Sequence, residues 1–238
     1  MNNNLNLNDG VFVNDDAATK SFVSNVFAYM ALALAISGAL AYLFGTTDLK
    51  YTLYSETSGM SILGWIVMFV PLAFILAMNF GFNKMSFNTL FIVFLGYAAV
   101  MGMSLSFIFW AYELGVITKV FFITAGLFGA MAFIGYTTKT DLTKFGGILM
   151  MAVIGLVIAS VVNMFMDSKP FDYLISCAGV LIFTGLTAYD VQKIKRIGAG
   201  VEFGTAEASK LALMGALTLY LDFVNLFMFL LRVFARRD

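Results

Sequence analysis

The residues best suited to chemistry are two aspartates that lie in apolar surroundings in the last quarter of the chain. Asp222 lies near the middle of residues 211–234, a stretch long and apolar enough to cross a bilayer. Asp190 ends another apolar stretch, within LIFTGLTAYDVQKIKR. A charge at membrane depth costs roughly 2.5–3.5 kcal/mol on insertion scales, so it needs a proton, a partner or a water-filled cavity. Each aspartate is therefore a candidate functional residue.

Helical periodicity could bring these two aspartates together. At 3.6 residues per turn, Asp190 and Asp222 each lie on a polar stripe of their own segment. Both carboxyl groups cannot ionise cheaply if the stripes meet, and the pair would then titrate as a unit. Carboxylates, an amide and backbone oxygens also suit a hard cation such as Ca²⁺. The supporting side chains on the two stripes are Ser176, Thr184 and Thr187 in the first segment, and Thr218 and Asn225 in the second.

Depth argues against this pairing. Asp190 lies three residues before Lys193, which puts it about 5 Å from the polar edge, whereas Asp222 lies about 18 Å along a helix from Lys210. The two carboxyl groups can meet if the last helix begins well out in the cytoplasm, or if Asp190 lies deeper than its flanks suggest. The plainer alternatives are that Asp190 sits at the water boundary and that Asp222 has a structural role.

Other residues suggest little further chemistry. Glu113, in the short loop WAYELG, could recruit a cation at an outer mouth, or could simply be a solvated loop residue. The chain has no histidine and one cysteine, Cys177, which has no partner for an internal disulfide. We therefore predict no resident cofactor, with Ca²⁺ as a permeant ion, and expect any pH response to come from carboxylates.

The composition predicts an integral membrane protein. The 238 residues are 61% hydrophobic and only 12% charged, well away from the usual balance of soluble domains. The net charge of zero gives no indication of nucleic-acid binding. We predict an all-α bundle of seven transmembrane helices over residues 21–238, preceded by a mobile cytoplasmic tail at 1–20. The seven apolar stretches are 22–44, 61–80, 87–110, 116–136, 146–166, 171–190 and 211–233.

Small residues and loop charges predict the packing and the orientation. Ala125 and Gly129, like Gly126 and Ala130, are four residues apart, a spacing that favours close helix packing in lipid. Basic residues concentrate in the loops that share a side with the N-terminus, which predicts a cytoplasmic N-terminus. Seven crossings then place Arg232 and the basic tail outside, against that rule. We favour seven crossings over the alternative, in which the last segment re-enters and leaves on the cytoplasmic side.

Four stretches carry a family resemblance. They read SLSFIFWAYELGVITKVFFITAGLFGAMAFIGYTTKTDLTKFG, IGLVIASVVNMF, TGLTAYDVQKIK and LYLDFVNLFMFLLRVF. In these stretches the chain resembles the Bax inhibitor-1/YccA family, closest to its bacterial YccA-like branch, and the resemblance extends over about residues 22–234.

This resemblance implies a fold and a function. The fold would be a seven-helix bundle whose last helix is central and wrapped by the other six. Asp190 and Asp222 would match the paired-aspartate sensor that couples proton binding to opening in the calcium-leak members. Those members place an arginine beside the pair on the second helix, whereas residues 61–83 here contain no charged residue. The implied location is the bacterial inner membrane, and we expect a monomer surrounded by lipid.

Three functions remain open at this point. The first is a pH-sensitive Ca²⁺ leak channel, and the second is a regulatory protein that binds a membrane-bound ATP-dependent protease, a role that the resemblance links to an exposed N-terminal tail. The third is an intramembrane aspartyl protease, which has a Gly-x-Gly-Asp motif. Leu219, Tyr220 and Leu221 precede Asp222 instead, so we do not expect an enzyme.

Overall fold

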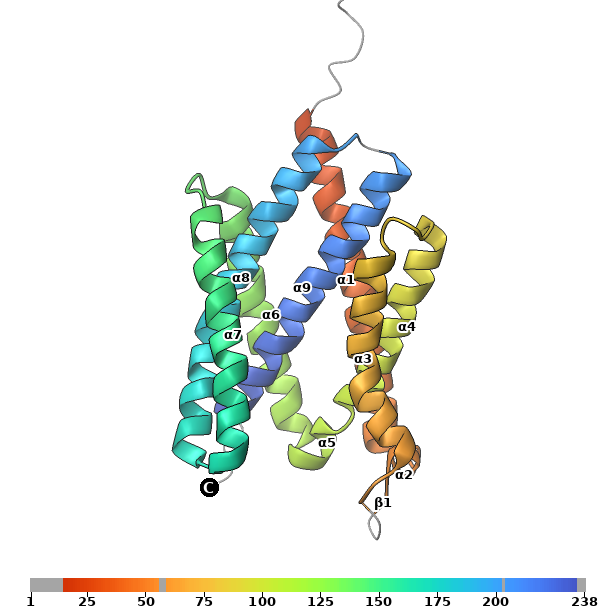
Figure 1. Cartoon of the computed structure of the whole chain (residues 1–238), viewed down its shortest axis with the longest axis vertical. Coiled ribbons are helices and arrows are strands. Elements are labelled where there is room, and N and C mark those ends of the chain that lie inside the picture. The colour runs from red at the N-terminus through yellow and green to blue at the C-terminus, as the bar shows by residue number, and fades with distance from the viewer. Residues whose placement is uncertain (1–14, 56–58, 203, 235–238) are drawn as a thin grey trace, which may run out of the picture.

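The protein is a bundle of long helices. The computed structural model describes residues 15–55, 59–202 and 204–234 (Figure 1). Within these residues, seven helices, with α4 and α5 counted as one, are long and apolar enough to cross a membrane. This confirms the predicted all-α, multi-span class. The long helices are α1 (Asp15–Thr46), α3 (Ile62–Gly81), α4 (Phe87–Leu105), α6 (Leu114–Thr137), α7 (Thr143–Met166), α8 (Lys169–Gly200) and α9 (Ala206–Phe234).

Short elements connect the helices at the end of the bundle where α9 finishes. They are α2 (Lys50–Leu53), the strands β1 (Tyr54–Ser55) and β2 (Gly59–Met60), and α5 (Ile108–Ala111). The two strands pair antiparallel as a small hairpin. The opposite end, where α1 begins, holds the α3–α4, α6–α7 and α8–α9 connections (Figure 1). We call these the C-terminal end and the N-terminal end of the bundle.

Serine residues mark the beginnings of three helices. The Ser61 hydroxyl accepts a hydrogen bond from the Gly64 amide at the start of α3. Ser86 and Ser168 cap α4 and α8 in the same way. Such caps accept hydrogen bonds from first-turn amide groups that have no carbonyl partner. Lipid hydrocarbon has no acceptor for these groups.

Helix α9 is the most buried of the spanning helices. In its most apolar 18-residue window 61% of the residues are buried, compared with 6% in α7. It packs against α8, α1, α6 and α4, and crosses the bundle diagonally between the α7–α8 and α3–α4 pairs (Figure 1). Helix α3 packs chiefly against α4, and α7 against α8. The expected ring of six helices around the last is therefore not confirmed, because α3 and α7 belong to an outer layer.

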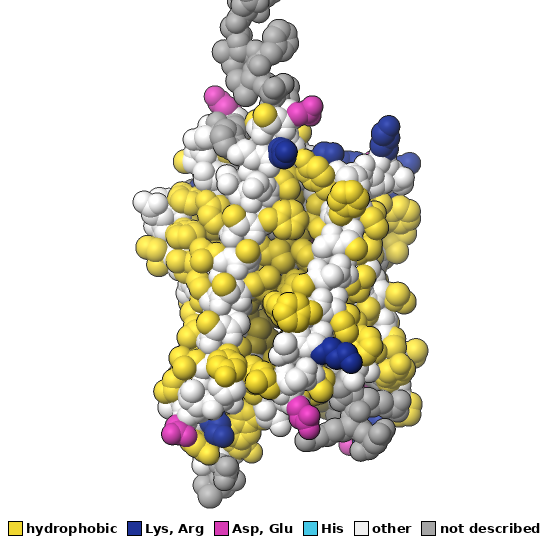
Figure 2. All heavy atoms as spheres, turned by 180° about the vertical axis from the view of Figure 1, so that it is seen from behind, with side chains coloured by type: hydrophobic (Ala, Val, Ile, Leu, Met, Phe, Trp, Pro, Cys, Tyr) yellow, Lys and Arg dark blue, Asp and Glu magenta, His cyan; other side chains and the backbone are white. Residues whose placement is uncertain are grey.

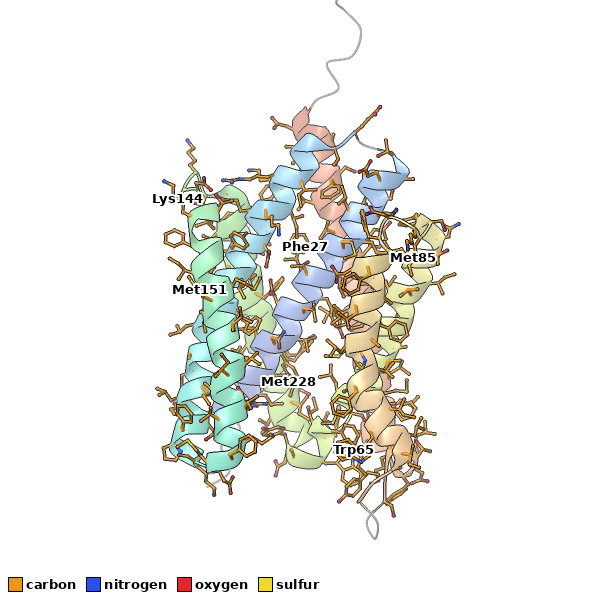
Figure 3. All side chains as sticks on the ribbon, viewed as in Figure 1. Phe27, Trp65, Met85, Lys144, Met151 and Met228 are labelled. Atoms are coloured by element: carbon orange, nitrogen blue, oxygen red, sulfur yellow. The ribbon has the colours of Figure 1, made fainter. Side chains whose placement is uncertain are left out.

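Large apolar side chains cover the outside of the bundle. Met151 on α7 and Trp65 on α3 are exposed and project from the outer helices (Figure 3). Phe80, Phe165 and Leu181 are also exposed. An apolar surface this extensive is stable only against lipid, since a soluble protein exposes much smaller apolar patches. Its position on the outer helices supports the membrane assignment.

Two boundaries differ from the sequence prediction. The predicted spans at 171–190 and 211–233 left residues 191–210 as a connection, but α8 continues to Gly200 and α9 begins at Ala206. The apolar pattern stops at Asp190 because the last turns of α8 are polar, and these turns remain helical by packing against neighbouring helices. Gly198, for example, lies so close to Phe22 of α1 that a Cβ would overlap the ring.

Helix α1 begins earlier than expected. Residues 15–20 were assigned to a mobile tail, but they form the first turns of α1, and Thr19 is buried. Asp16 suits this position because a carboxylate stabilises the positive end of the helix dipole. Residues 1–14, the rest of the predicted tail, lie outside the described residues.

Candidate functional site

Asp190 of α8 and Asp222 of α9 face each other inside the bundle. Their side chains lie within hydrogen-bonding reach of one another, and the residues are only 7% and 5% exposed. Oδ2 of Asp222 is buried with no hydrogen-bond partner among the described residues. Ionised carboxylates only accept hydrogen bonds, so a bond between these two requires a proton. The two aspartates singled out in the sequence thus form one site that can hold a shared proton.

Helix length and tilt remove the expected mismatch in depth. Asp190 is ten residues before the end of α8, or about 15 Å, and Asp222 is sixteen residues after the start of α9, or about 24 Å. Because α9 runs diagonally through the bundle (Figure 1), its residues gain depth more slowly than those of a straight helix. Asp190 therefore lies inside the bundle and not at the end of its helix.

Few cations lie near the aspartate pair. Lys193, three residues after Asp190 on α8, is the cation that acts on it electrostatically, and the Lys193 side chain is exposed. Helix α3 carries no charged residue. Among the described residues, the one ion pair found joins Arg196 to Asp141, so neither buried aspartate takes part in one. The arginine that the resemblance implied on the second helix has no substitute in direct contact with the pair.

The predicted supporting residues bond to their own helices. Thr187 Oγ1 donates to the Phe183 carbonyl, at 2.8 Å. Thr218 Oγ1 and Asn225 Nδ2 donate to carbonyls four residues earlier on α9. No described hydrogen bond joins these three side chains to either carboxyl group. Thr187, Thr218 and Asn225 therefore satisfy their polar groups within the helix, as hydroxyl and amide groups in apolar surroundings must.

Gln192, which we did not single out in the sequence, fastens the α6–α7 loop to α8. The residue is buried, its Oε1 accepts the Leu142 amide and its Nε2 donates to the Thr140 carbonyl, both at 2.8 Å. These contacts join the GYTTKTDL and YDVQKIKR motifs, which are about 50 residues apart. A buried glutamine two residues from Asp190 thus ties the loop to the helix that carries the site.

Two basic residues complete this attachment. Lys195 Nζ donates to the Tyr136 carbonyl at 2.9 Å. Arg196 Nη2 lies 2.7 Å from Asp141 Oδ1. Hydrogen bonds from the Thr143 hydroxyl and amide, together with Arg196, hold the pKa of Asp141 at about 2, below its usual value. The loop carboxylate is therefore charged throughout the physiological range and cannot be the pH-sensitive group.

A second buried polar cluster lies on another face of α9. Tyr220 and Tyr97 of α4 are fully buried and pack edge to face, with ring centroids 5.5 Å apart. The Tyr97 hydroxyl has no hydrogen-bond partner among the described residues, and the Tyr220 hydroxyl faces Ser37 of α1 without a well-formed bond. Helix α9 thus turns a carboxyl group toward α8 and a hydroxyl group toward α1 and α4.

The C-terminal end of the bundle holds a polar cavity of about 700 Å³. Asn163, Asp167, Asp172 and Arg232 line it, with other residues of α7 and α8. Glu113, the predicted outer-mouth carboxylate, is the exposed N-cap of α6 and is not among the lining residues. We missed this cavity in the sequence, although two aspartates flank the short connection between the fifth and sixth spans.

The fold and the site define a multi-span α-helical membrane protein with a buried aspartate pair at its centre. Residues 19–238 match the family described as Inhibitor of apoptosis-promoting Bax1, and the chain belongs to this Bax inhibitor family. The family resemblance drawn from the aspartate motifs is therefore confirmed.

Bacterial relatives align over most of the chain. The inner membrane protein YbhL of Escherichia coli is 37% identical over 222 residues, 93% of this chain and 94% of that protein. A protein of Borreliella burgdorferi is 42% identical over 217 residues, 91% of this chain and 92% of its own. A Rickettsia prowazekii protein, RP147, is 40% identical over 225 residues, 93% and 92% of the two chains. The family match over residues 19–238 includes both the sixth and the seventh spans, where the aspartate pair lies.

Proposed function

We propose that this protein is a pH-sensitive cation leak channel, with Ca²⁺ as a permeant ion, in which the Asp190–Asp222 pair is the proton sensor. The observation that carries the proposal is the contact between the two carboxyl groups inside the bundle. Charge repulsion between two ionised carboxylates at this separation is strong in a low-dielectric interior. The number of protons on the pair therefore acts directly on the packing of α8 against α9.

The conformation described here fits a closed path. Between Asp222 and the cavity at the C-terminal end, α9 buries Leu226, Leu230 and Leu231 against its neighbours. A hydrated cation cannot pass through packed leucine side chains, so conduction requires the helices to separate along this segment. The polar cavity beyond it, with Asp167 and Asp172, would then be the outer vestibule, and Glu113 would act only as a charge near its rim.

Ca²⁺ would be a passing ion and not a resident cofactor. The ion prefers six to eight oxygen ligands, and two carboxyl groups supply at most four oxygens. Asn225 lies on α9 three residues after Asp222, and its amide oxygen would add one ligand, which still leaves fewer than six. Two carboxylates can attract a cation weakly and release it, which suits a leak and does not suit storage or catalysis. We accordingly propose no enzymatic activity.

Charge distribution supports an orientation with the N-terminus in the cytoplasm. Basic residues are enriched on the cytoplasmic side of membrane proteins, and an inner membrane relative supports placement in the bacterial inner membrane. At the C-terminal end the described basic residues are Lys50, Lys119, Lys169 and Arg232. Those at the N-terminal end are Lys20, Lys84, Lys139, Lys144, Lys193, Lys195, Arg196 and Lys210.

Calcium flux into liposomes tests the proposal. The purified protein is reconstituted with a trapped calcium dye, and influx is measured from acid to neutral pH. We expect influx above that of empty liposomes with a marked pH dependence. Asp222→Asn should remove the pH dependence, because an amide replaces the titrating group, whereas the control Asp141→Asn should keep it. No influx above empty liposomes at any pH would show that the proposal is wrong.

The alternative is a regulatory protein without transport of its own, which binds a membrane-bound ATP-dependent protease. The charge-free helix α3 favours this alternative, because it leaves the aspartate pair without the cationic partner that a charge lock requires. The tail should be tested by deleting residues 2–14, since residues 15–20 belong to α1. Loss of co-purification with the protease on deletion supports the alternative, and a full-length chain that captures no protease contradicts it.

A further inference from the structure

Helices α1 and α6 lie on either side of an open seam. Both pack against α8 and α9, but they make almost no contact with each other. The seam is therefore floored by α8 and α9 and opens sideways, toward the space that lipid occupies. The space-filling view of this side shows a hollow lined with hydrophobic side chains along the middle of the molecule (Figure 2).

Two apolar hollows follow one another along this seam. The one nearer the N-terminal end has about 410 Å³ and is lined by Val23 and Phe27 of α1 and by residues of α6. The other has about 310 Å³ and extends toward the C-terminal end. The α6 residues in the first hollow are Gly129, Ala132, Phe133 and Tyr136, and the second includes Gly38, Ala41, Ile117 and Phe121.

Gly126 and Gly129 of α6 have no packing partner among the described residues. A Cβ built on Gly126 or Gly129 would meet no atom within 4 Å. The four-residue spacing of small residues at 125–130, which predicted close helix packing, therefore does not serve that purpose at these two glycines. A groove of small and apolar residues that opens sideways in a membrane is filled by lipid chains, because contact between its apolar walls and water is unfavourable.

Positive charge gathers where this seam reaches the N-terminal end. Lys20 lines the apolar hollow, and an adjacent hollow of about 230 Å³ is lined by Lys139, Lys195 and Arg196, with Asp16 as its one acidic residue. Residues of α1 and α6 line both hollows, and α8 and the α6–α7 loop also line the charged one. Figure 2 shows Lys and Arg side chains at this end of the molecule.

Two of these cations are available for a ligand. Arg196 pairs with Asp141, and Lys195 donates to the Tyr136 carbonyl. Lys20 and Lys139 are exposed and take part in no described ion pair or hydrogen bond. An anionic headgroup in this position would meet both lysines while its acyl chain entered the groove below them.

We propose that the α1–α6 seam binds an anionic phospholipid of the leaflet at the N-terminal end. Lys20 and Lys139 hold the phosphate, and the acyl chain lies along Phe27, Gly129 and Ala132. Lysine side chains near the membrane surface attract anionic lipids, and the groove adds apolar contact that a bulk lipid does not have. This site is separate from the aspartate pair and does not depend on the proposed channel activity.

Thermal unfolding with added lipid tests the charged part of the site. We expect phosphatidylglycerol to raise the unfolding temperature of the detergent-solubilised protein more than phosphatidylcholine does, and inorganic phosphate to have no effect. Lys20→Gln with Lys139→Gln should abolish the advantage of phosphatidylglycerol. The control, Lys84→Gln with Lys144→Gln, removes the same charge at the same end outside the seam and should keep it. Equal loss in both double variants would overturn the proposal.

Native mass spectrometry tests the groove. Gly129→Leu fills the hollow, and Gly155→Leu is the matched control, since a Cβ at Gly155 on α7 also meets no atom within 4 Å but faces away from the seam. We expect Gly129→Leu to lose one tightly bound phosphatidylglycerol and Gly155→Leu to retain it. Unchanged lipid binding by Gly129→Leu would contradict the proposal, even if the lysine variants proved unstable.

Discussion

The carboxyl groups of Asp190 and Asp222 are each other's main polar partner, because the surrounding side chains offer them few hydrogen bonds. The nearby hydroxyl and amide groups of Thr187, Thr218 and Asn225 bond to their own helices. Burial makes an isolated carboxylate costly, and a second carboxylate can relieve that cost only by sharing a proton. We therefore propose that the two carboxyl groups share a proton.

Tyr97 offers a simple test of the second polar cluster. Its buried hydroxyl has no described hydrogen-bond partner, so Tyr97→Phe should leave stability unchanged or raise it by up to about 1 kcal/mol. The edge-to-face contact with Tyr220 would be kept. Tyr97→Ala, in contrast, should cost about 3–5 kcal/mol, because it empties a packed site. Thermal unfolding in detergent measures both, and a large loss in Tyr97→Phe would mean that the hydroxyl has a partner.

At the scale of elements, α8 connects the aspartate pair to the α6–α7 loop. One helix carries Asp190, and within the next two turns it carries Gln192, Lys195 and Arg196, all of which contact the loop or the end of α6. A close approach of α6 to α8 at Gly135, where a Cβ would overlap the Ala188 backbone, holds the two helices together. Movement of α8 at the pair should therefore move the loop as well.

Removing the glutamine should loosen this attachment. Gln192→Leu leaves the Leu142 amide and the Thr140 carbonyl without their described partners, which should cost about 1–3 kcal/mol for each group that stays buried. Gln192→Glu keeps the acceptor for Leu142 and should cost less. Hydrogen exchange of the 138–142 amides measures the effect, and equal protection in Gln192→Leu and wild type would contradict the role assigned to this side chain.

The ion pair between Asp141 and Arg196 should not respond to physiological pH. The pKa of Asp141 lies at about 2 in the folded protein and near 3.8 without its partners. A lowered pKa contributes stability that is fully present above the unfolded value and is lost as pH falls through the folded value. The stability difference between wild type and Asp141→Asn should therefore be constant from about pH 5 to 8 and shrink below about pH 4. A difference that varied between pH 5 and 8 would count against this ion pair.

At the scale of the whole molecule, the first and last described residues, Asp15 and Phe234, lie at opposite ends of the bundle. Helix α9 is continuous from Ala206 to Phe234 and does not turn back (Figure 1). Arg232 lies in the last turn of α9, where its positive charge interacts favourably with the negative end of the helix dipole. This gives one local reason for a basic residue there. The continuous helix fits seven spans and not a last segment that re-enters, and the side on which the basic tail lies stays a prediction.

Cysteine labelling tests this arrangement. In a Cys177→Ala background, Phe234→Cys should react with a membrane-impermeant maleimide. The maleimide is added to cells whose outer membrane is permeabilised and whose inner membrane is intact. Lys84→Cys, at the other end of the bundle, should react only after lysis. Labelling of both positions from the same side would contradict the seven-span arrangement.

The amino-acid sequence alone determined the class of the protein, its seven spans and the two residues of the central pair. Apolar length and isolated carboxylates are local properties, so they can be found without knowing what packs against what. The sequence could not determine where α8 ends, because its last turns are polar and are held by contacts with Phe22 and with the α6–α7 loop. The tertiary structure likewise decided three further features. They are the contact of Asp190 with Asp222, the hydrogen bonds of Gln192 to the α6–α7 loop, and the open seam between α1 and α6. Each depends on helix tilt and on contacts between residues distant in the chain.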